Sequence, residues 1–389
     1  MTETALRAPA PPDAELRGGA IPLREGAARR RFRVQVQTNL DPLPAAWGRL
    51  EATGHHTAFQ TQAWLLPWYR IIAHHRGAKP LLVTVSDAVS HEPLLFFPLV
   101  TRRDDTYRWI EFADLGVSDY NAPLVAPGFA PDERQLRRLM REFFSALPSA
   151  DLLRFDKTPD TLGDAPNPLA GHEMFHRMRF QSWGVGLPAT RAGFEAGLSP
   201  GFLKELGRKH RRLAGKGEVR LQLAGSEREV VEIFGALVDQ RRRRFTELGR
   251  ENVLDDAVFR DFYETVILSS LRTGFASLAA LRCGDEIVAT LFGLRSRGAF
   301  HLLMSTMQGG KWKSSSPGNV AIDEMISAMI GEGEDHFDFT IGDELYKRDF
   351  GARPANLYEC VRAQSILGAP FAFKTNARAI IRNRLRGLK

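Results

Sequence analysis

One stretch near the carboxyl end of the chain, residues 301–351, constrains the fold most strongly. Its pattern predicts a strand (His301–Thr306), a loop rich in glycine and serine, a helix (Val320–Ile330) and a second strand (Phe337–Ile341). Strands that alternate with helices favour an α/β fold. The loop leaves backbone N–H groups free at a helix N-terminus, where the helix dipole favours negative charge, so it is a place to hold phosphate.

The loop does not match the standard nucleotide-binding motifs. It has no Gly-Lys-Ser/Thr ending, as a Walker loop requires, and it lacks the G-x-G-x-x-G spacing of a dinucleotide fold. A loop of this kind is also common as an ordinary strand–helix connection. The compound pattern is more specific, and it consists of Ser316-Pro317-Gly318, then Phe337-Asp338-Phe339, then Gly342-Asp343-Glu344 and Tyr346-Lys347-Arg348.

This compound pattern resembles the coenzyme A pyrophosphate site of GNAT N-acyltransferases, in the branch of CelD-type and FemAB-like enzymes. The resemblance implies acyl-coenzyme A as cosubstrate, no prosthetic group, and direct transfer to an amine without a covalent enzyme intermediate. It assigns the acyl carbonyl and pantetheine to His301–Met307 and the pyrophosphate to Gln308–Asn319. The donor-site residues expected from it are Met304, Ser305, Thr306, Lys313, Ser315, Ser316, Gly318 and Asn319. Lys313 and its neighbour Lys311 either contact phosphate or are ordinary surface lysines.

Three side chains just after the second strand are candidates for proton transfer. The reaction must remove a proton from the attacking ammonium and supply one to the departing thiolate. Asp343 is preferred over Glu344 as the base or amine anchor because it is closer to the strand end, and Tyr346 is the candidate thiolate acid. The alternatives are that Asp343 closes the turn at Gly342 and that Tyr346 is a core tyrosine.

Four further residues are candidates for substrate binding. The resemblance implies that Lys347 and Arg348 help to hold the acceptor or the donor phosphate. It also implies that Asp119 and Tyr120, in the polar segment Gly116–Asn121, face the cleft between the two halves of the chain. The alternative for this segment is a simple turn.

The arginine run, the histidines and the cysteines are weaker candidates for a functional site. The run Arg241–Arg244 cannot face one way on a helix, so most of it should be exposed, although one arginine can reach an anionic acceptor. The histidines have no convincing ligand spacing, so no metal is expected. Two cysteines, Cys283 and Cys360, cannot form a disulfide framework and favour a reducing cytoplasm.

The chain is long enough for two domains, each with its own core. We expect a disordered leader (1–31), a first α/β half (32–170), a second half (171–365) and a basic amphipathic tail (366–389). The second half has the element order of a GNAT domain. The resemblance extends this to mixed sheets in a tandem GNAT-like arrangement, as in Fem-type transferases.

The tail concentrates the net charge of +7, since Phe371–Lys389 holds six basic residues and no acidic one. Apolar residues recur there at helical spacing, at Ala377, Ile380, Ile381, Leu385 and Leu388. Such a helix can lie on an anionic membrane surface or dock on its own domain. No apolar run approaches the roughly 20 residues of a membrane-spanning helix. Residues 1–31 lack the apolar region of a secretory signal. No nucleic-acid motif is present, so nucleic acid is not an expected partner.

These observations predict an acyl-coenzyme A-dependent N-acyltransferase, cytoplasmic or peripheral at the inner membrane. By resemblance alone, its acceptor is an amine on a sugar or lipid intermediate of envelope or exopolysaccharide synthesis. A long-chain N-acyltransferase acting on a sphingoid-type or other lipid amine is the alternative among enzymes. A catalytically degenerate GNAT pair that serves as a binding or scaffold protein is the alternative from another class.

Overall fold

The structure, a computed structural model, describes residues 31–386. The predicted leader lies outside the described residues apart from its last position. The first half contains β1 (Phe32–Gln37), α1 (Ala45–Thr53), η2 (Ala58–Gln60), α2 (Gln62–Trp68), η3 (Tyr69–Ala73), β2 (Lys79–Asp87), β3 (Pro93–Arg103), β4 (Arg108–Phe112), β5 (Leu124–Val125), α3 (Glu133–Ala146), β6 (Leu152–Pro159), β7 (Thr161–Leu162) and β8 (Ala165–Pro166).

The second half begins with a long strand and ends in a helix. It contains β9 (His176–Gly186), α4 (Arg191–Ala196), α5 (Pro200–Ala214), β10 (Val219–Leu223), α6 (Glu227–Glu247), η4 (Val253–Asp255), α7 (Ala257–Ser270), β11 (Ala276–Cys283), β12 (Glu286–Ser296), β13 (Ala299–Met307), η5 (Gly310–Ser315), α8 (Pro317–Gly331), β14 (His336–Ile341), α9 (Tyr346–Asp349), β15 (Arg353–Ala363) and α10 (Ala369–Arg386).

A single mixed sheet of thirteen strands runs through the described chain, in the order β1-β2-β3-β4-β6-β15-β9-β14-β13-β12-β11-β10, with β5 paired to β3. Most neighbours are antiparallel, but β4 pairs with β6 in parallel and β13 pairs with β14 in parallel. The chain crosses between these partners through α3 in the first half and α8 in the second, as parallel strands require. The predicted mixed α/β architecture is therefore confirmed, and each half contains one strand–helix–strand unit.

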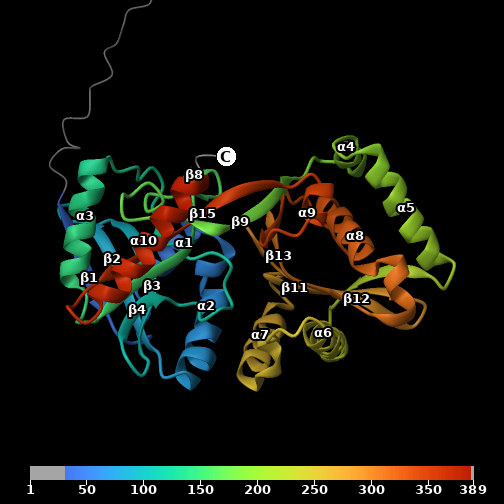
Figure 1. Ribbon diagram of the computed structural model, residues 1–389, viewed down its shortest axis with the longest axis horizontal. Coiled ribbons are helices and arrows are strands. Elements are labelled where there is room, and N and C mark those ends of the chain that lie inside the picture. The colour runs from blue at the N-terminus through green and yellow to red at the C-terminus, as the bar shows by residue number, and fades with distance from the viewer. Residues whose placement is uncertain (1–30, 387–389) are drawn as a thin grey trace, which may run out of the picture.

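Two strands join the halves at the centre of the sheet (Figure 1). The strand β15 pairs with β9 of the second half along its first part and with β6 of the first half along its last part. The strand β9 also pairs with β14. The proposed domain boundaries therefore fall within one continuous sheet.

The helix α10 returns to the first half. The ring of Phe371 contacts the rings of Tyr107 and Trp109, and Asn376 Nδ2 donates a hydrogen bond to the carbonyl of Val361, 2.8 Å away. The tail is thus a docked helix over its described length. None of the helices within residues 31–386 combines the length and the apolar character needed to cross a membrane.

Candidate active site

The strands β13 and β14 separate early. They pair only from Ala299 to His301 on one strand and from His336 to Asp338 on the other, and beyond these positions they diverge. On its other side, β13 carries one extra residue, Leu303, where the register with β12 shifts. A bulge of this kind bends a strand. The bulge in β13 therefore helps to open the gap between β13 and the parallel strand β14.

The bulge depends on a glycine in the neighbouring strand. A Cβ atom at Gly293 of β12 would lie 2.3 Å from a ring carbon of Phe300, which is fully buried, and 2.6 Å from the carbonyl oxygen of His301. Any larger residue at this position would push β13 away. The close approach explains why glycine stands in a strand that is otherwise apolar.

A cavity of about 320 Å³ lies at the open end of the gap. Its lining joins the end of β13, the start of α8 and the segment that follows β14. Seven of the predicted site residues line it: Ser305, Thr306, Lys313, Gly318, Asn319, Glu344 and Tyr346. The structure therefore brings the donor-site candidates and two proton-transfer candidates to one place.

The remaining donor-site candidates lie beside the cavity but are not among its lining. Met304 and Ser315 are buried. Ser316 has a left-handed backbone (φ 44°) and precedes Pro317, the first residue of α8, without capping the helix through its side chain. Pro317 has no N–H group, and the N–H of Asn319 donates to the carbonyl of Ser316 at 3.1 Å, so Gly318 can offer its backbone N–H to a ligand. Lys311, by contrast, pairs with Glu286 at 2.6 Å, away from the cavity lining.

The helix α6 supplies lining residues that the sequence did not single out as donor contacts. Gln240, Arg243 and Arg244 line the cavity together with Lys313. Arg241 instead donates a hydrogen bond to Asn252 Oδ1 at 2.9 Å. The arginine run is mostly exposed, as expected, and two of its members add positive charge to the cavity.

Only one of the two acidic candidates after β14 lines the cavity. Asp343 and Glu344 are both exposed, but Glu344 is part of the cavity lining and Asp343 is not. The reason is the turn at Gly342, which has φ 131°; a Cβ there would lie 2.3 Å from Glu344 Oε2. Position therefore favours Glu344 over Asp343.

Tyr346 is largely buried beside Glu344 in the cavity wall. Burial first, and then the negative charge of Glu344, raises the pKa of the Tyr346 hydroxyl well above its usual range. The phenol therefore keeps its proton near neutral pH. It can donate a hydrogen bond to a negatively charged atom in the cavity.

The two basic residues of the motif, Lys347 and Arg348, both contact other parts of the protein. Lys347 is 2% exposed, and its Nζ donates to the carbonyls of Ile341 (3.0 Å) and Gly342 (3.1 Å) and lies 2.9 Å from Glu344 Oε2. The ammonium group thus holds the turn after β14 and orients Glu344. Arg348 is exposed, with its guanidinium 5.0 Å from the ring centre of Trp183.

Tyr120 does not line an open cleft. It is 4% exposed, and its hydroxyl donates a hydrogen bond to Asp338 Oδ1 at 2.9 Å. His301 Nδ1 lies 3.0 Å from the other oxygen of Asp338. His301 begins the range expected to hold the acyl group, and Asp338 belongs to the compound pattern, but the sequence did not predict their contact with Tyr120, because only the tertiary fold brings them together.

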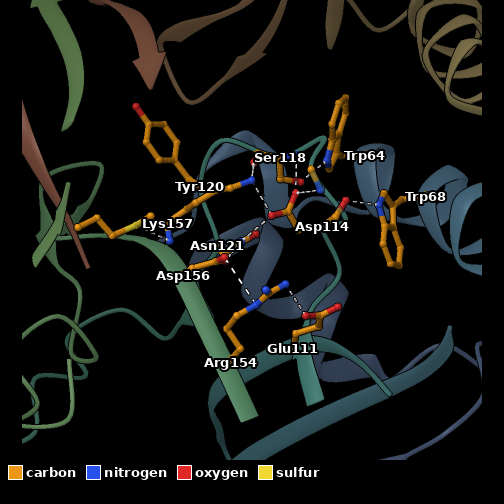
Figure 2. A network of polar contacts seen from close by, with 12 residues as sticks. Trp64, Trp68, Glu111, Asp114, Ser118, Tyr120, Asn121, Arg154, Asp156 and Lys157 are labelled. Carbon is orange, nitrogen blue, oxygen red and sulfur yellow. Dashed lines mark hydrogen bonds and ion pairs between the residues drawn. The ribbon is translucent and has the colours of Figure 1, made fainter. Parts of the chain in front are cut away.

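A polar network holds the loop that presents Tyr120 (Figure 2). Asp114 accepts hydrogen bonds from the N–H groups of Gly116 (3.0 Å) and Ser118 (2.9 Å), and Lys157 Nζ lies 2.7 Å from Asp114 Oδ2. Burial alone would raise the pKa of Asp114, but the Lys157 ammonium and the surrounding donors outweigh it and lower that pKa. The ring of Tyr120 points away from this network (Figure 2) and toward the second half.

Asp119 lies next to the point where β13 and β14 separate. Burial raises the pKa of its carboxyl group, although Lys157 and a hydrogen bond with Thr340 act in the opposite direction. Thr340 Oγ1 in turn donates to the carbonyl of Leu302, 3.0 Å away across the gap. The first half therefore contributes a half-buried carboxyl group beside the bulge.

Comparison with known proteins agrees with this geometry. Residues 201–348 match the family model described as an acetyltransferase (GNAT) domain. The structure is similar to the crystal structure of FemX, with a TM-score of 0.59 and 9% identity over 87% of this chain and 98% of that one. It is also similar to a conserved protein of unknown function from Bacteroides thetaiotaomicron VPI-5482, with a TM-score of 0.51 and 10% identity over 85% of this chain and 100% of that one. The comparison with curated proteins found no match.

The fold and the family match together define a transferase. Residues 201–348 of the second half are similar to a GNAT acetyltransferase domain, and the chain as a whole shares the fold of FemX. The fold, the enzyme class and the family resemblance inferred from the sequence are thus confirmed.

Proposed function

We propose that this protein transfers an acyl group from acyl-coenzyme A to an amine by direct attack within a ternary complex. The observation that carries the proposal is the single cavity that joins the end of β13, the N-terminus of α8 and the pair Glu344 and Tyr346. Acyl-coenzyme A has a long pantetheine arm, a diphosphate and a thioester. In this proposal β13 binds the arm, the start of α8 binds the diphosphate, and Glu344 and Tyr346 lie near the thioester.

The residues present suit such a donor. The backbone N–H of Gly318 and the dipole of α8 favour the pyrophosphate, and Lys313, Arg243 and Arg244 supply positive charge in the same wall. Ser305 and Thr306, on the edge of β13 that no longer pairs with β14, offer backbone groups to the pantetheine arm. Holding the donor and the amine together supplies much of the rate, because a thioester is already activated.

The proton steps fall to two side chains in this proposal. Glu344 accepts the proton of the attacking ammonium, directly or through water, while Lys347 fixes its carboxylate. Tyr346 donates a hydrogen bond to the sulfur as negative charge develops on it. Asp119, beside the bulge, is the candidate to bind the incoming amine.

The acceptor we propose is an amine on a sugar or lipid intermediate of envelope or exopolysaccharide synthesis, which rests on the sequence resemblance. A lipid amine, such as a sphingoid base, is the second candidate, and the basic helix α10 favours it. We also propose a cytoplasmic protein that associates peripherally with the inner membrane; its two cysteines are free and buried. A degenerate scaffold protein is the remaining alternative.

A thermal-shift panel tests the proposal. Coenzyme A and acyl-coenzyme A esters of increasing chain length should raise the melting temperature, because a ligand that binds only the folded state stabilises it. The ester giving the largest shift would then be tested for thiol release with amino sugars and lipid amines. Stabilisation by coenzyme A without thiol release in the presence of any amine would favour the scaffold alternative.

A further inference from the structure

The helix α10 docks on the sheet, mainly on β15 and β9, through only one of its faces. Ala372 and Ala379 are buried, and Asn376 donates to the carbonyl of Val361. Arg382 forms an ion pair with Glu359 and donates to the carbonyl of Arg177 at 2.8 Å. Small and polar side chains, together with the ring of Phe371 at the start of the helix, therefore make the contact with the rest of the protein.

The opposite face of α10 presents large apolar side chains to solvent. Phe373 is 78% exposed, Ile380 is 41% exposed and Ile381 is 59% exposed, while Ile366 and Leu367 in the preceding turn are 94% and 56% exposed. Six of the thirteen large apolar side chains found exposed within the described residues lie in the short span 366–381. Single exposed apolar residues are normal on a soluble protein, but a cluster marks an interaction site.

Positive charge borders this cluster. Lys374, Arg378 and Arg384 are exposed on the same helix, and residues 366–384 contain no acidic residue. An apolar stripe that includes an aromatic side chain, next to basic residues, is typical of helices that lie in the plane of a membrane interface. Basic residues at such a surface are attracted to anionic lipid headgroups.

We propose that this surface, the α10 outer face, docks on an anionic phospholipid membrane. It consists of Ile366, Leu367, Phe373, Ile380 and Ile381 with the bordering Lys374, Arg378 and Arg384. The charge favours a membrane over a second copy of the chain, because a symmetric pairing would bring like charges together. The proposal deepens the peripheral location proposed above and shows how one helix can both dock on its domain and meet a lipid surface.

Co-sedimentation of the full chain with vesicles tests the proposal. The protein should sediment with vesicles of phosphatidylcholine and phosphatidylglycerol, should remain in solution with phosphatidylcholine alone, and should be released by salt. The variant Lys374→Gln/Arg378→Gln/Arg384→Gln should lower the partition coefficient about fivefold per charge removed. The variant Phe373→Ser/Ile380→Ser/Ile381→Ser should also lose binding, whereas Val231→Ser, a change of an exposed apolar residue on α6, should not.

Absence of sedimentation with the anionic vesicles would overturn the proposal, as would equal binding by the three variants. Self-association that the apolar variant abolishes, without vesicle binding by the unmodified chain, would assign the face to a second copy instead. Coenzyme A affinity, measured in parallel, should be unchanged in the α10 variants. An unmodified chain that binds the vesicles but does not bind coenzyme A would contradict the proposed function and leave the membrane proposal intact.

Discussion

The hydroxyl of Tyr120 donates a hydrogen bond to Asp338 Oδ1, 2.9 Å away, across 218 positions of the chain. Asp338 pairs with His301 in the last register position before β13 and β14 separate, and the two side chains also contact each other at 3.0 Å. The first half of the protein therefore braces the point at which the cavity of the second half begins to open.

This brace predicts the behaviour of Tyr120→Phe. Loss of a buried hydrogen bond to a charged group should lower the free energy of unfolding by about 1–3 kcal/mol, measured by urea denaturation. It should also raise the KM for acyl-coenzyme A, because the gap between the strands loses a support. Tyr69→Phe is the matched control, since Tyr69 donates to the carbonyl of Leu99 within the first half. Equal KM values for the two variants would argue against the brace.

The carboxyl group of Asp119 predicts a dependence of stability on pH. Because burial raises its pKa, the folded state holds the proton more tightly than the unfolded state. Its favourable contribution is therefore present below about pH 3.9 and is lost as the pH rises through the folded-state pKa. Asp119→Asn should be more stable than the unmodified chain at neutral pH and should show no gain in acid.

The same substitution should lower turnover if Asp119 binds the amine. Thermal melts at several pH values and steady-state rates would be measured on the same preparation. A gain in stability that is independent of pH would mean that the carboxyl group is not the cause. Unchanged turnover would remove Asp119 from the acceptor site.

The proton-transfer assignment predicts a clear ranking of three variants. Glu344→Gln and Tyr346→Phe should lower turnover roughly 10²–10⁴-fold with little change in coenzyme A affinity. Asp343→Asn is the matched control, because its side chain is exposed outside the cavity lining, and it should stay near the unmodified rate. A large loss in Asp343→Asn alone would restore the assignment made from the sequence.

Variants of Lys347 and Arg348 distinguish a structural role from a role in substrate binding. Lys347→Met leaves the carbonyls at the end of β14 without their donor, so unfolding should be easier by about 1–3 kcal/mol. Arg348→Met removes an exposed cation next to Trp183 and should cost about 1 kcal/mol or less. Unchanged stability together with lost substrate affinity in Lys347→Met would return this lysine to the substrate site.

The sequence predicts the central elements of the second half well. The expected spans His301–Thr306, Val320–Ile330 and Phe337–Ile341 correspond closely to β13, α8 and β14. Each is a run rich in apolar residues, and the glycine- and serine-rich loop marks the boundary between the first strand and the helix. The strand β9, His176–Gly186, was not predicted, because polar and basic residues occupy much of it and its partners lie far away in the sequence.

The site was predictable only where it follows one continuous stretch of chain. Ser305, Thr306, Gly318 and the residues after β14 belong to a local pattern. The bracing residues His301 and Asp338, and the lining residues Arg243 and Arg244, depend on contacts between distant segments, which a single sequence does not reveal. The placement of Glu344, rather than Asp343, in the cavity lining depends on the backbone turn at Gly342.

Calorimetric titration of coenzyme A tests the central claim most directly. Gly318 lines the cavity at the start of α8, and a Cβ there would meet Met307 Sδ at an ordinary 3.5 Å, so Gly318→Ala should fold and bind coenzyme A nearly as the unmodified chain does. Gly318→Asp places a negative charge where the pyrophosphate is proposed to bind and should abolish the binding heat while the melting temperature stays close to that of Gly318→Ala. Unchanged coenzyme A affinity in a folded Gly318→Asp protein would contradict the account.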